Sequence, residues 1–263
     1  VFNAYNFRDF CWKGDSLFFV TSGVFGCYSK FHSIANNELG IRAIVLHNRG
    51  CRALTIDRKT GIIYFASIDG LFKYVNGVIT EIKLKGKSIF ANKLVFSDNQ
   101  LWVGSVNEGL YILQNDKILK HYNHENLLHG DGVKCFKILD EIVFVATEQG
   151  LTKINYKTDH VDFFDYSDGI VSKEINYIDY FKGNVYLGTN KGLLKLPSQM
   201  VKNTVYPNII ITSVLINQLL VKSTFNLLDL DYNQNNIDIE FSTACLRSRG
   251  NFKFKYRLLG LDT

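Results

Sequence analysis

A short pattern of residues recurs along the chain at intervals of about 40 residues. Each copy has an apolar run, a small residue, Ser or Thr, a polar turn, Gly and a second apolar run; the clearest copy is Leu101–Tyr111. The turn glycines are separated by 39 residues from Gly70 to Gly109, by 41 from Gly109 to Gly150 and by 42 from Gly150 to Gly192. A less regular copy, Phe18–Val24, comes first. A repeat of this length that contains several short strands is typical of β-propeller blades.

Each part of the pattern has a physical explanation in a propeller blade. A strand that is apolar on both faces is expected where one sheet packs between two others. Ser or Thr can hold the turn backbone by side-chain hydrogen bonds, and Gly ends the turn where a positive φ is needed. The small residues before the turns are Ala66, Gly104, Ala146 and Gly188. We therefore expect Trp102, Gly104 and Gly188 to be buried between blades. Unrelated hairpins are the alternative, but four copies in register disfavour it.

The composition fits a large β-domain and disfavours several other classes of protein. The 263 residues are enough for one large domain, with or without a small one, and 46% of them are hydrophobic. The net charge is +5, but the Lys residues are scattered without a basic block, so nucleic-acid binding is not expected. The five Cys form no CxxC pair, so we expect buried thiols and no zinc site or other cofactor.

The sequence contains no apolar run long enough for a transmembrane helix, and it does not begin with a signal peptide. It begins with Val in the middle of the repeat pattern. We expect it to be a piece of a longer protein, with any membrane contact made through segments outside this chain.

Two domains are expected, because the hydrophobic pattern changes after Pro197. Residues 1–205 are predicted to form propeller blades with little or no helix. Strict alternation of apolar and polar residues begins again at Ile237–Ser242 and Phe252–Leu258. A period of two is typical of half-buried strands in an antiparallel sandwich. Residues 206–263 are therefore predicted to begin an immunoglobulin-like β-sandwich, in which these two segments pair through a turn.

The repeats, above all Leu101–Tyr111, resemble two-component regulator propeller repeats. The segment Phe254–Asp262 resembles the start of the triple-tyrosine (Y_Y_Y) domain. The two modules in this order are similar to the periplasmic sensor region of hybrid two-component histidine kinases, and the resemblance covers nearly the whole chain. Phe254 stands where that family usually has Tyr, and five repeats are visible where the family usually has seven blades. The resemblance implies that the five blades belong to a seven-bladed ring.

The resemblance implies a role in signal transduction. The chain would be an extracytoplasmic, ligand-sensing fragment of a two-component receptor, located in the periplasm as the ectodomain of an inner-membrane protein. A polysaccharide-derived oligosaccharide is the implied ligand, and a homodimer is the implied state of the full-length receptor. The fragment itself would not be an enzyme, although a histidine kinase domain could lie elsewhere in the full-length protein.

Candidate ligand-binding residues follow from the geometry of propeller blades. Loops that lead into an innermost strand share one face with the turns between second and third strands, and carboxylates and amides there can bind sugar hydroxyls. The candidates on this face are Asn107, Glu108, His129, Asp131, Glu148, Gln149, Asp168, Lys173, Asn190 and Lys191. Such a rim suits a protein partner equally well, and each residue alone can be an ordinary exposed turn residue.

No catalytic or metal site is predicted. The sequence contains no G-x-S-x-G, H-E-x-x-H or phosphate-binding loop. Glu108 and Glu148 occupy equivalent turn positions in successive repeats, so solvated turn residues are favoured over an acid–base pair. His121 and His124 are interpreted as part of a polar loop and not as metal ligands. Two alternatives to a sensor remain open: a propeller-fold carbohydrate-active enzyme, such as a polysaccharide lyase or glycosidase, and a scaffold that binds proteins.

Overall fold

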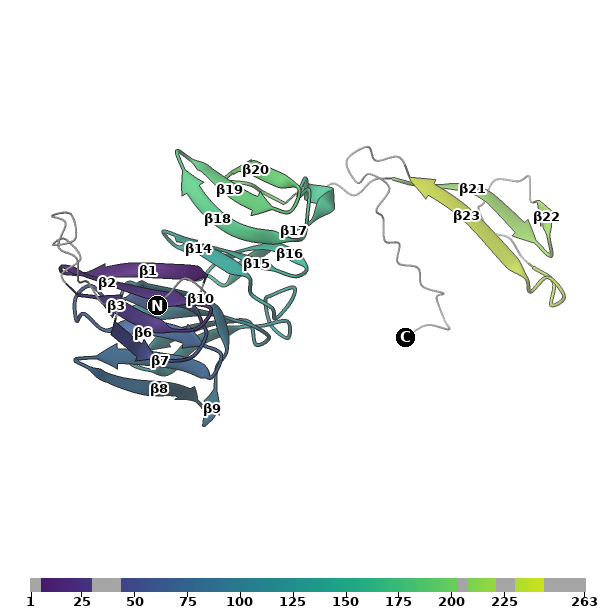
Figure 1. Ribbon diagram of the computed structural model, residues 1–263. Coiled ribbons are helices and arrows are strands. Elements are labelled where there is room, and N and C mark those ends of the chain that lie inside the picture. Colours follow the sequence, from purple (N-terminus) through teal and green to yellow (C-terminus); the bar gives the residue numbers. More distant parts are fainter. Residues whose placement is uncertain (1–5, 30–43, 203–207, 221–229, 244–263) are drawn as a thin grey trace. The chain divides into compact units, whose positions relative to one another are not determined.

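The computed structural model describes residues 6–29, 44–202, 208–220 and 230–243, and the chain divides into two units (Figure 1). The first unit comprises Val1–Asp165 and Ile170–Val201, and the second comprises Tyr166–Gly169 and Lys202–Thr263. The expected domain boundary between residues 205 and 206 lies outside the described residues. The described part contains strands, turns and one short 3-10 helix, η2 (Tyr166–Asp168). The prediction of a nearly all-β chain is confirmed.

The described residues of the first unit form five antiparallel sheets, each with its strands in chain order. The first sheet contains β1 (Phe7–Lys13), β2 (Ser16–Thr21), β3 (Phe25–Tyr28) and β4 (Ile44–His47). The second contains β5 (Cys51–Ile56), β6 (Ile63–Ser67), β7 (Gly70–Val75), β8 (Val78–Leu84) and β9 (Lys87–Ser88). The third contains β10 (Ala91–Ser97), β11 (Gln100–Ser105), β12 (Leu110–Gln114) and β13 (Lys117–Tyr122). The fourth contains β14 (Cys135–Leu139), β15 (Ile142–Thr147), β16 (Gly150–Asn155) and β17 (His160–Phe164). The fifth contains β18 (Ile175–Phe181), β19 (Asn184–Thr189) and β20 (Gly192–Pro197).

These sheets are propeller blades. Their innermost strands, β1, β5, β10, β14 and β18, follow one another side by side, so each blade packs face to face against the next. Four clusters of buried side chains fill the four spaces between successive blades. In the cluster between the third and fourth blades, Trp102 packs with Phe136, and Trp102 is 1% exposed. A fully buried side chain of this kind contributes about 1.5–3 kcal/mol. The strands of the middle blades are therefore apolar on both faces because both faces are covered.

The turn chemistry that the repeats predict is present in all five blades. The last residue of each second strand accepts a hydrogen bond from a backbone N–H two or three residues later. These acceptors are the hydroxyls of Thr21, Ser67, Ser105, Thr147 and Thr189. All four turn glycines of the matched copies have positive φ, and a Cβ on Gly109 would lie 2.0 Å from the carbonyl oxygen of Tyr122. A side chain at Gly109 would therefore collide with the backbone of its own blade.

The expectation for the small residues holds at Gly104 but is wrong at Gly188. Gly104 is buried, and a Cβ there would lie 2.8 Å from Cγ1 of Val133 on the entry to the fourth blade. Gly188 is only half-buried, and a Cβ there would lie 3.5 Å from the Cβ of Tyr177, an ordinary contact. The reason is that the fifth blade is covered on one side only by described residues. Its innermost strand exposes 59% of Tyr177, and β20 exposes 74% of Leu193.

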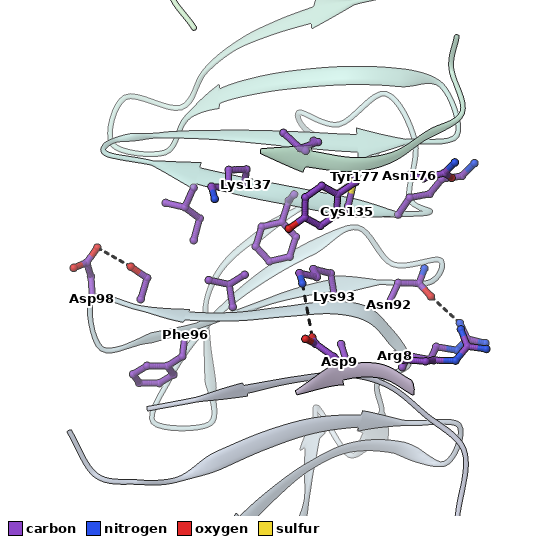
Figure 2. Close-up of a pocket in the computed structure, with 18 of the residues that line it drawn as sticks. Arg8, Asp9, Asn92, Lys93, Phe96, Asp98, Cys135, Lys137, Asn176 and Tyr177 are labelled. Atoms are coloured by element: carbon purple, nitrogen blue, oxygen red, sulfur yellow. Dashed lines mark hydrogen bonds and ion pairs between the residues drawn. The ribbon is translucent and has the colours of Figure 1, made fainter. Parts of the chain in front are cut away.

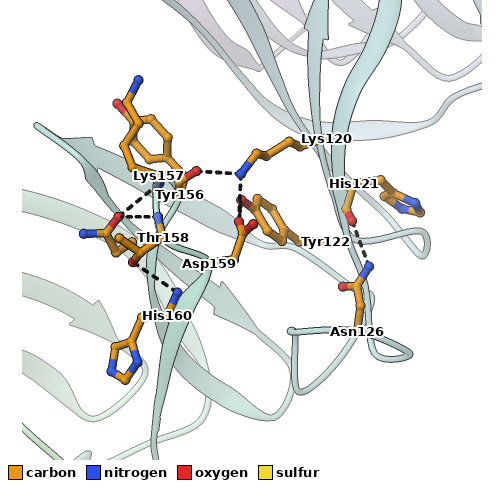
Figure 3. Close-up of polar contacts among 10 residues, drawn as sticks. Lys120, His121, Tyr122, Asn126, Tyr156, Lys157, Thr158, Asp159 and His160 are labelled. Carbon is orange, nitrogen blue, oxygen red and sulfur yellow. Dashed lines mark hydrogen bonds and ion pairs between the residues drawn. The ribbon is translucent and has the colours of Figure 1, made fainter.

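Polar contacts also join the blades at their outer parts (Figure 3). The ammonium group of Lys120, on β13, donates to the carbonyl oxygen of Tyr156 at 2.7 Å and to Oδ1 of Asp159 at 2.8 Å in the fourth blade. Lys73 of the second blade forms an ion pair with Asp116, in the turn between β12 and β13 of the third. The same type of contact therefore links two successive pairs of blades.

The second unit contains a three-stranded sheet in the order β22 (Leu219–Leu220), β21 (Ile209–Ile216) and β23 (Ile237–Thr243). β21 and β23 are antiparallel, with Ile216 opposite Ile237, and the hydroxyl of Ser213 donates to Glu240 at 2.5 Å. The predicted partner of β23, Phe252–Leu258, lies outside the described residues. The expected sandwich around this sheet stays a prediction.

Candidate functional site

One face of the first unit combines the turns between second and third strands with the loops that enter the innermost strands. In the third blade, the N–H of Gly109 donates to the carbonyl oxygen of Asp131 at 2.8 Å, and the N–H of Val133 donates to that of Ser105 at 3.0 Å. These backbone bonds tie the β11–β12 turn to the loop that enters β14. The expectation that turns and entry loops share a face is confirmed for these blades. We call this the turn face.

Two adjoining cavities open on the turn face. The larger has about 450 Å³ of space and lies between the third and fourth blades, lined by Asn92, Asn107, Asp131, Lys134 and Glu148 among others. The smaller has about 190 Å³ and lies between the second and third blades, where Arg52, Ser67, Ile68 and Phe90 join Asn107. Asn107 and Val106 line both cavities because the β11–β12 turn separates them.

A third cavity, which we call the axial cavity, lies among the innermost strands and has about 720 Å³ of space. It receives residues from β1, β5, β10, β14 and β18 (Figure 2). Figure 2 shows Arg8, Asn92 and Asn176 at one end and Asp98 at the other. Arg52, Asn92 and Lys134 also line the cavities of the turn face, so the three hollows adjoin one another.

Three of the ten predicted binding residues come together in one cavity. Asn107 is exposed, and the larger turn-face cavity also contains Asp131 and Glu148. Glu148 accepts a hydrogen bond from the N–H of Gly132 at 3.1 Å, and Asp131 accepts one from the N–H of His124 at 2.7 Å and pairs with its imidazole. Each carboxylate is thereby positioned by the entry loop of the fourth blade and retains acceptor capacity toward the cavity.

The other seven predicted residues lie outside that cavity. Glu108 is held within its own blade, since the hydroxyl of Tyr111 donates to Oε2 at 3.1 Å. His129 stacks on Phe163, with ring centroids 4.0 Å apart. Asn190 accepts from the hydroxyl of Ser172 at 2.6 Å. Gln149 and Lys191 are exposed turn residues, and Lys173 is half-buried in the entry to β18. Asp168 belongs to the second unit, where its carboxylate pairs with Lys202 at 3.6 Å.

Sequence reasoning missed the polar residues of the innermost strands. In β5, Cys51 pairs with Ser67 and Ala53 with Ala66, so Arg52 is an extra residue in a β-bulge. Arg8, Asn92 and Asn176 are bulge residues at the same place in β1, β10 and β18. In the fourth blade, β14 pairs with β15 without a shift in register, and Lys134 directly precedes β14. All five line the axial cavity, and we call them the bulge row. An alignment of the innermost strands would have found them, because each is a polar residue at the start of its strand or, for Lys134, directly before it.

Of the described cysteines, Cys27, Cys51 and Cys135 are buried and Cys11 is half-buried. Burial raises the pKa of Cys51 and of Cys135 to about 12. The positive charges of Lys93 and Lys134 lower the pKa of Cys135, but the effect of burial is larger. Among the residues that the structure describes, no three His, Cys, Asp or Glu side chains are grouped as metal ligands, and no helix is long and apolar enough to cross a membrane.

Comparisons with known proteins find one relative by sequence and several solved structures with a similar fold. No family model matches the chain. The chain is 28% identical over 136 residues to Histidine kinase P4 of Formosa agariphila, a match that covers 46% of this chain and 10% of that protein. Its structure is similar to the extracellular domain of a hybrid two component system from B. thetaiotaomicron, with a TM-score of 0.69, 15% identity, and coverage of 91% of this chain and 35% of that one.

A propeller is also among the similar structures. The WD40 β-propeller domain of Doa1 has a TM-score of 0.53 at 12% identity, with coverage of 74% of this chain and 66% of that domain. These comparisons confirm the propeller fold and the resemblance to the sensor regions of hybrid two-component systems. The chain spans only a tenth of the curated relative and about a third of the similar extracellular domain.

Proposed function

We propose that this chain is a ligand-sensing part of the extracytoplasmic region of a two-component signalling receptor, and that its ligand is a polysaccharide-derived saccharide. The fold shared with the extracellular domain of a hybrid two component system and the sequence match to a histidine kinase support the sensor role. Binding of the ligand would change the geometry of the ectodomain, or of a homodimer of it in the periplasm, and segments outside this chain would carry the change to a membrane helix.

The observation that carries the choice of ligand is the group of adjoining cavities on the turn face. Asn107 offers an amide to both cavities, and the side chains of Asp131 and Glu148 offer carboxylate oxygens that are fixed by backbone N–H groups. Sugar hydroxyls both donate and accept hydrogen bonds, so amides beside positioned carboxylates match them. Phe90 and Ile68 supply apolar surface beside these groups for a sugar ring.

The test is a screen of neutral and acidic oligosaccharides by thermal shift, followed by calorimetry on those that bind. Asn107→Ala should weaken the binding of a screened saccharide roughly fivefold, since a lost hydrogen bond is worth about 1 kcal/mol. Gln114→Ala is the matched control, because Gln114 is an exposed amide at the opposite end of β12. Equal loss in both variants, or no saccharide bound at all, would contradict the proposal.

The same screen separates the sensor from its alternatives. A carbohydrate-active enzyme would convert the bound saccharide into products that chromatography detects. A scaffold for proteins would bind none of the saccharides. A sensor binds a saccharide and releases it unchanged.

A further inference from the structure

Each residue of the bulge row lies outside the residue-by-residue pairing of the first and second strands of its blade. In β10, Ala91 pairs with Ser105 and Lys93 with Gly104, and Asn92 between them has no partner in the ladder. Phe7 and Asp9 of β1 flank Arg8 in the same way, opposite Thr21 and Val20. A bulge bends its strand and re-aims the extra side chain. All five blades place a residue of the row against the axial cavity. Figure 2 shows three of them, Arg8, Asn92 and Asn176, together at one end of it.

The bulge row is rich in hydrogen-bond donors and contains no carboxylate. Arg8, Arg52 and Lys134 are cations, and Asn92 and Asn176 are amides. The guanidinium of Arg52 donates to Oδ1 of Asn92 at 2.7 Å, which fixes both side chains. Within the described part of the chain, the charged groups of Arg8 and Lys134 make no hydrogen bond or ion pair with protein groups. Two cations therefore line the cavity without a hydrogen bond or ion pair to a described carboxylate, and Lys134 also lines the larger turn-face cavity with Asp131 and Glu148.

The carboxylates that line the axial cavity are engaged elsewhere or lie at its other end. Asp9 faces Lys93 at 3.8 Å and accepts from the N–H of Leu54 at 3.4 Å. Asp98 bonds to Ser97 at the end of the cavity away from the row. Asp140 follows the far end of β14, whereas Lys134 precedes its start. The bulge row itself carries three positive charges and no negative one, and a local excess of positive charge attracts anions.

We propose that the bulge row is an anion site, which binds one carboxylate or sulfate group of a ligand that enters the axial cavity from the turn face. The guanidinium groups of Arg8 and Arg52 and the ammonium of Lys134 would donate to the oxyanion, and the amide of Asn176 would add a neutral donor. The inference rests on the proposed function for its ligand class: with sugar rings in the turn-face cavities, the ligand is an acidic oligosaccharide. The anion site itself can be tested without any saccharide.

The test compares binding of sulfate ion and of a trisaccharide of galacturonic acid to the whole chain, by calorimetry at constant ionic strength in sodium chloride. The double variant Arg8→Gln/Lys134→Gln should bind at least one of the two probes tenfold or more weakly. Because neither side chain bonds to the protein, the variant should melt within a few degrees of the wild type. The probe that binds more tightly distinguishes a sulfate ligand from a carboxylate ligand.

Lys87→Gln is the control for the loss of positive charge, since Lys87 is an exposed lysine on β9 at the outer part of the second blade. The proposal is overturned if neither probe binds the wild type, if the double variant binds as tightly as the wild type, or if Lys87→Gln weakens binding equally. Sulfate binding by the row without binding of any saccharide would support the anion site and contradict the proposed function. Binding of neutral saccharides alone would support the proposed function and contradict the anion site.

Discussion

Lys120 and Asp159 form an ion pair that joins the third and fourth blades, with Nζ 2.8 Å from Oδ1. The hydroxyl of Tyr122 donates to the same carboxylate oxygen at 2.8 Å. The hydrogen bond from Lys120, and then that from Tyr122, lower the pKa of Asp159 below its ordinary value of 3.8. Deprotonated Asp159 therefore stabilises the folded chain.

The first prediction is a pH-dependent loss of stability in Asp159→Asn. The pKa is lower in the folded chain, so the stabilisation is fully present above the unfolded value of 3.8 and is lost as pH falls through the folded value. At pH 7 the free energy of unfolding should fall by up to about 1 kcal/mol, a modest value because the pair is partly exposed. Urea unfolding between pH 3 and pH 7 measures this. Glu125→Gln, which removes an exposed carboxylate, should have little effect, and a pH-independent difference would refute the prediction.

The second prediction contrasts two glycines at equivalent positions. Gly104→Ala places a methyl group 2.8 Å from Cγ1 of Val133 and should lower the free energy of unfolding by roughly 1–3 kcal/mol. Gly188→Ala meets only the Cβ of Tyr177 at 3.5 Å and should leave stability within about 0.5 kcal/mol or raise it slightly. Equal effects in chemical denaturation would show that the two sites are packed alike.

The third prediction concerns thiol chemistry. Cys51 and Cys135 are buried with pKa values near 12, so almost no thiolate exists at pH 8. Iodoacetamide should leave both unmodified in the folded chain and modify both in 6 M guanidinium chloride, as peptide mass spectrometry would reveal. Rapid labelling of either cysteine without denaturant would mean that the second or fourth blade opens readily.

The fourth prediction is that the chain binds saccharides without turning them over. The carboxylates that an acid–base pair would need accept structural hydrogen bonds, Glu108 from Tyr111 and Glu148 from the N–H of Gly132. Neutral and acidic polysaccharides incubated with the chain should yield no new reducing ends and no unsaturated products. Product formation that is abolished by Glu108→Gln or Glu148→Gln would establish an enzyme.

The blades can be predicted from the periodicity of the sequence because the residues that define each strand lie close together in the chain. A run such as Leu101–Gly104 is apolar on both faces, and the Ser, Gly and small residues of the turn act within a few residues of it. The pairing of β11 with β10 and β12 follows directly from that order. The burial of Gly188 differs from the prediction because it depends on what covers the fifth blade, and no local pattern contains that information.

The binding residues were harder to predict than the fold. Asn107, Asp131 and Glu148 share a cavity because the turn of one blade bonds to the entry loop of the next, as the propeller geometry implies. Asp168 lies in the segment before β18, which the same propeller geometry predicts to be on this face, yet it belongs to the second unit. The hydrophobic pattern does not predict Arg8 and Arg52, because a bulge interrupts the alternation of apolar and polar residues by which the two faces of a strand are recognised.

In four of the five described blades, a bulge in the innermost strand separates the residues that the blade needs for folding from the residue that it presents to the cavity. A residue such as Arg52 has no partner in the ladder and lies outside the packed space between the sheets, so exchange at this position leaves the core intact. The five described blades therefore carry five positions around the axial cavity that can be exchanged without repacking the core. Duplication of a blade copies the residue at this position, and substitution replaces it. A receptor built in this way can acquire a new ligand by a few exchanges in one circle of residues, while its scaffold stays unchanged.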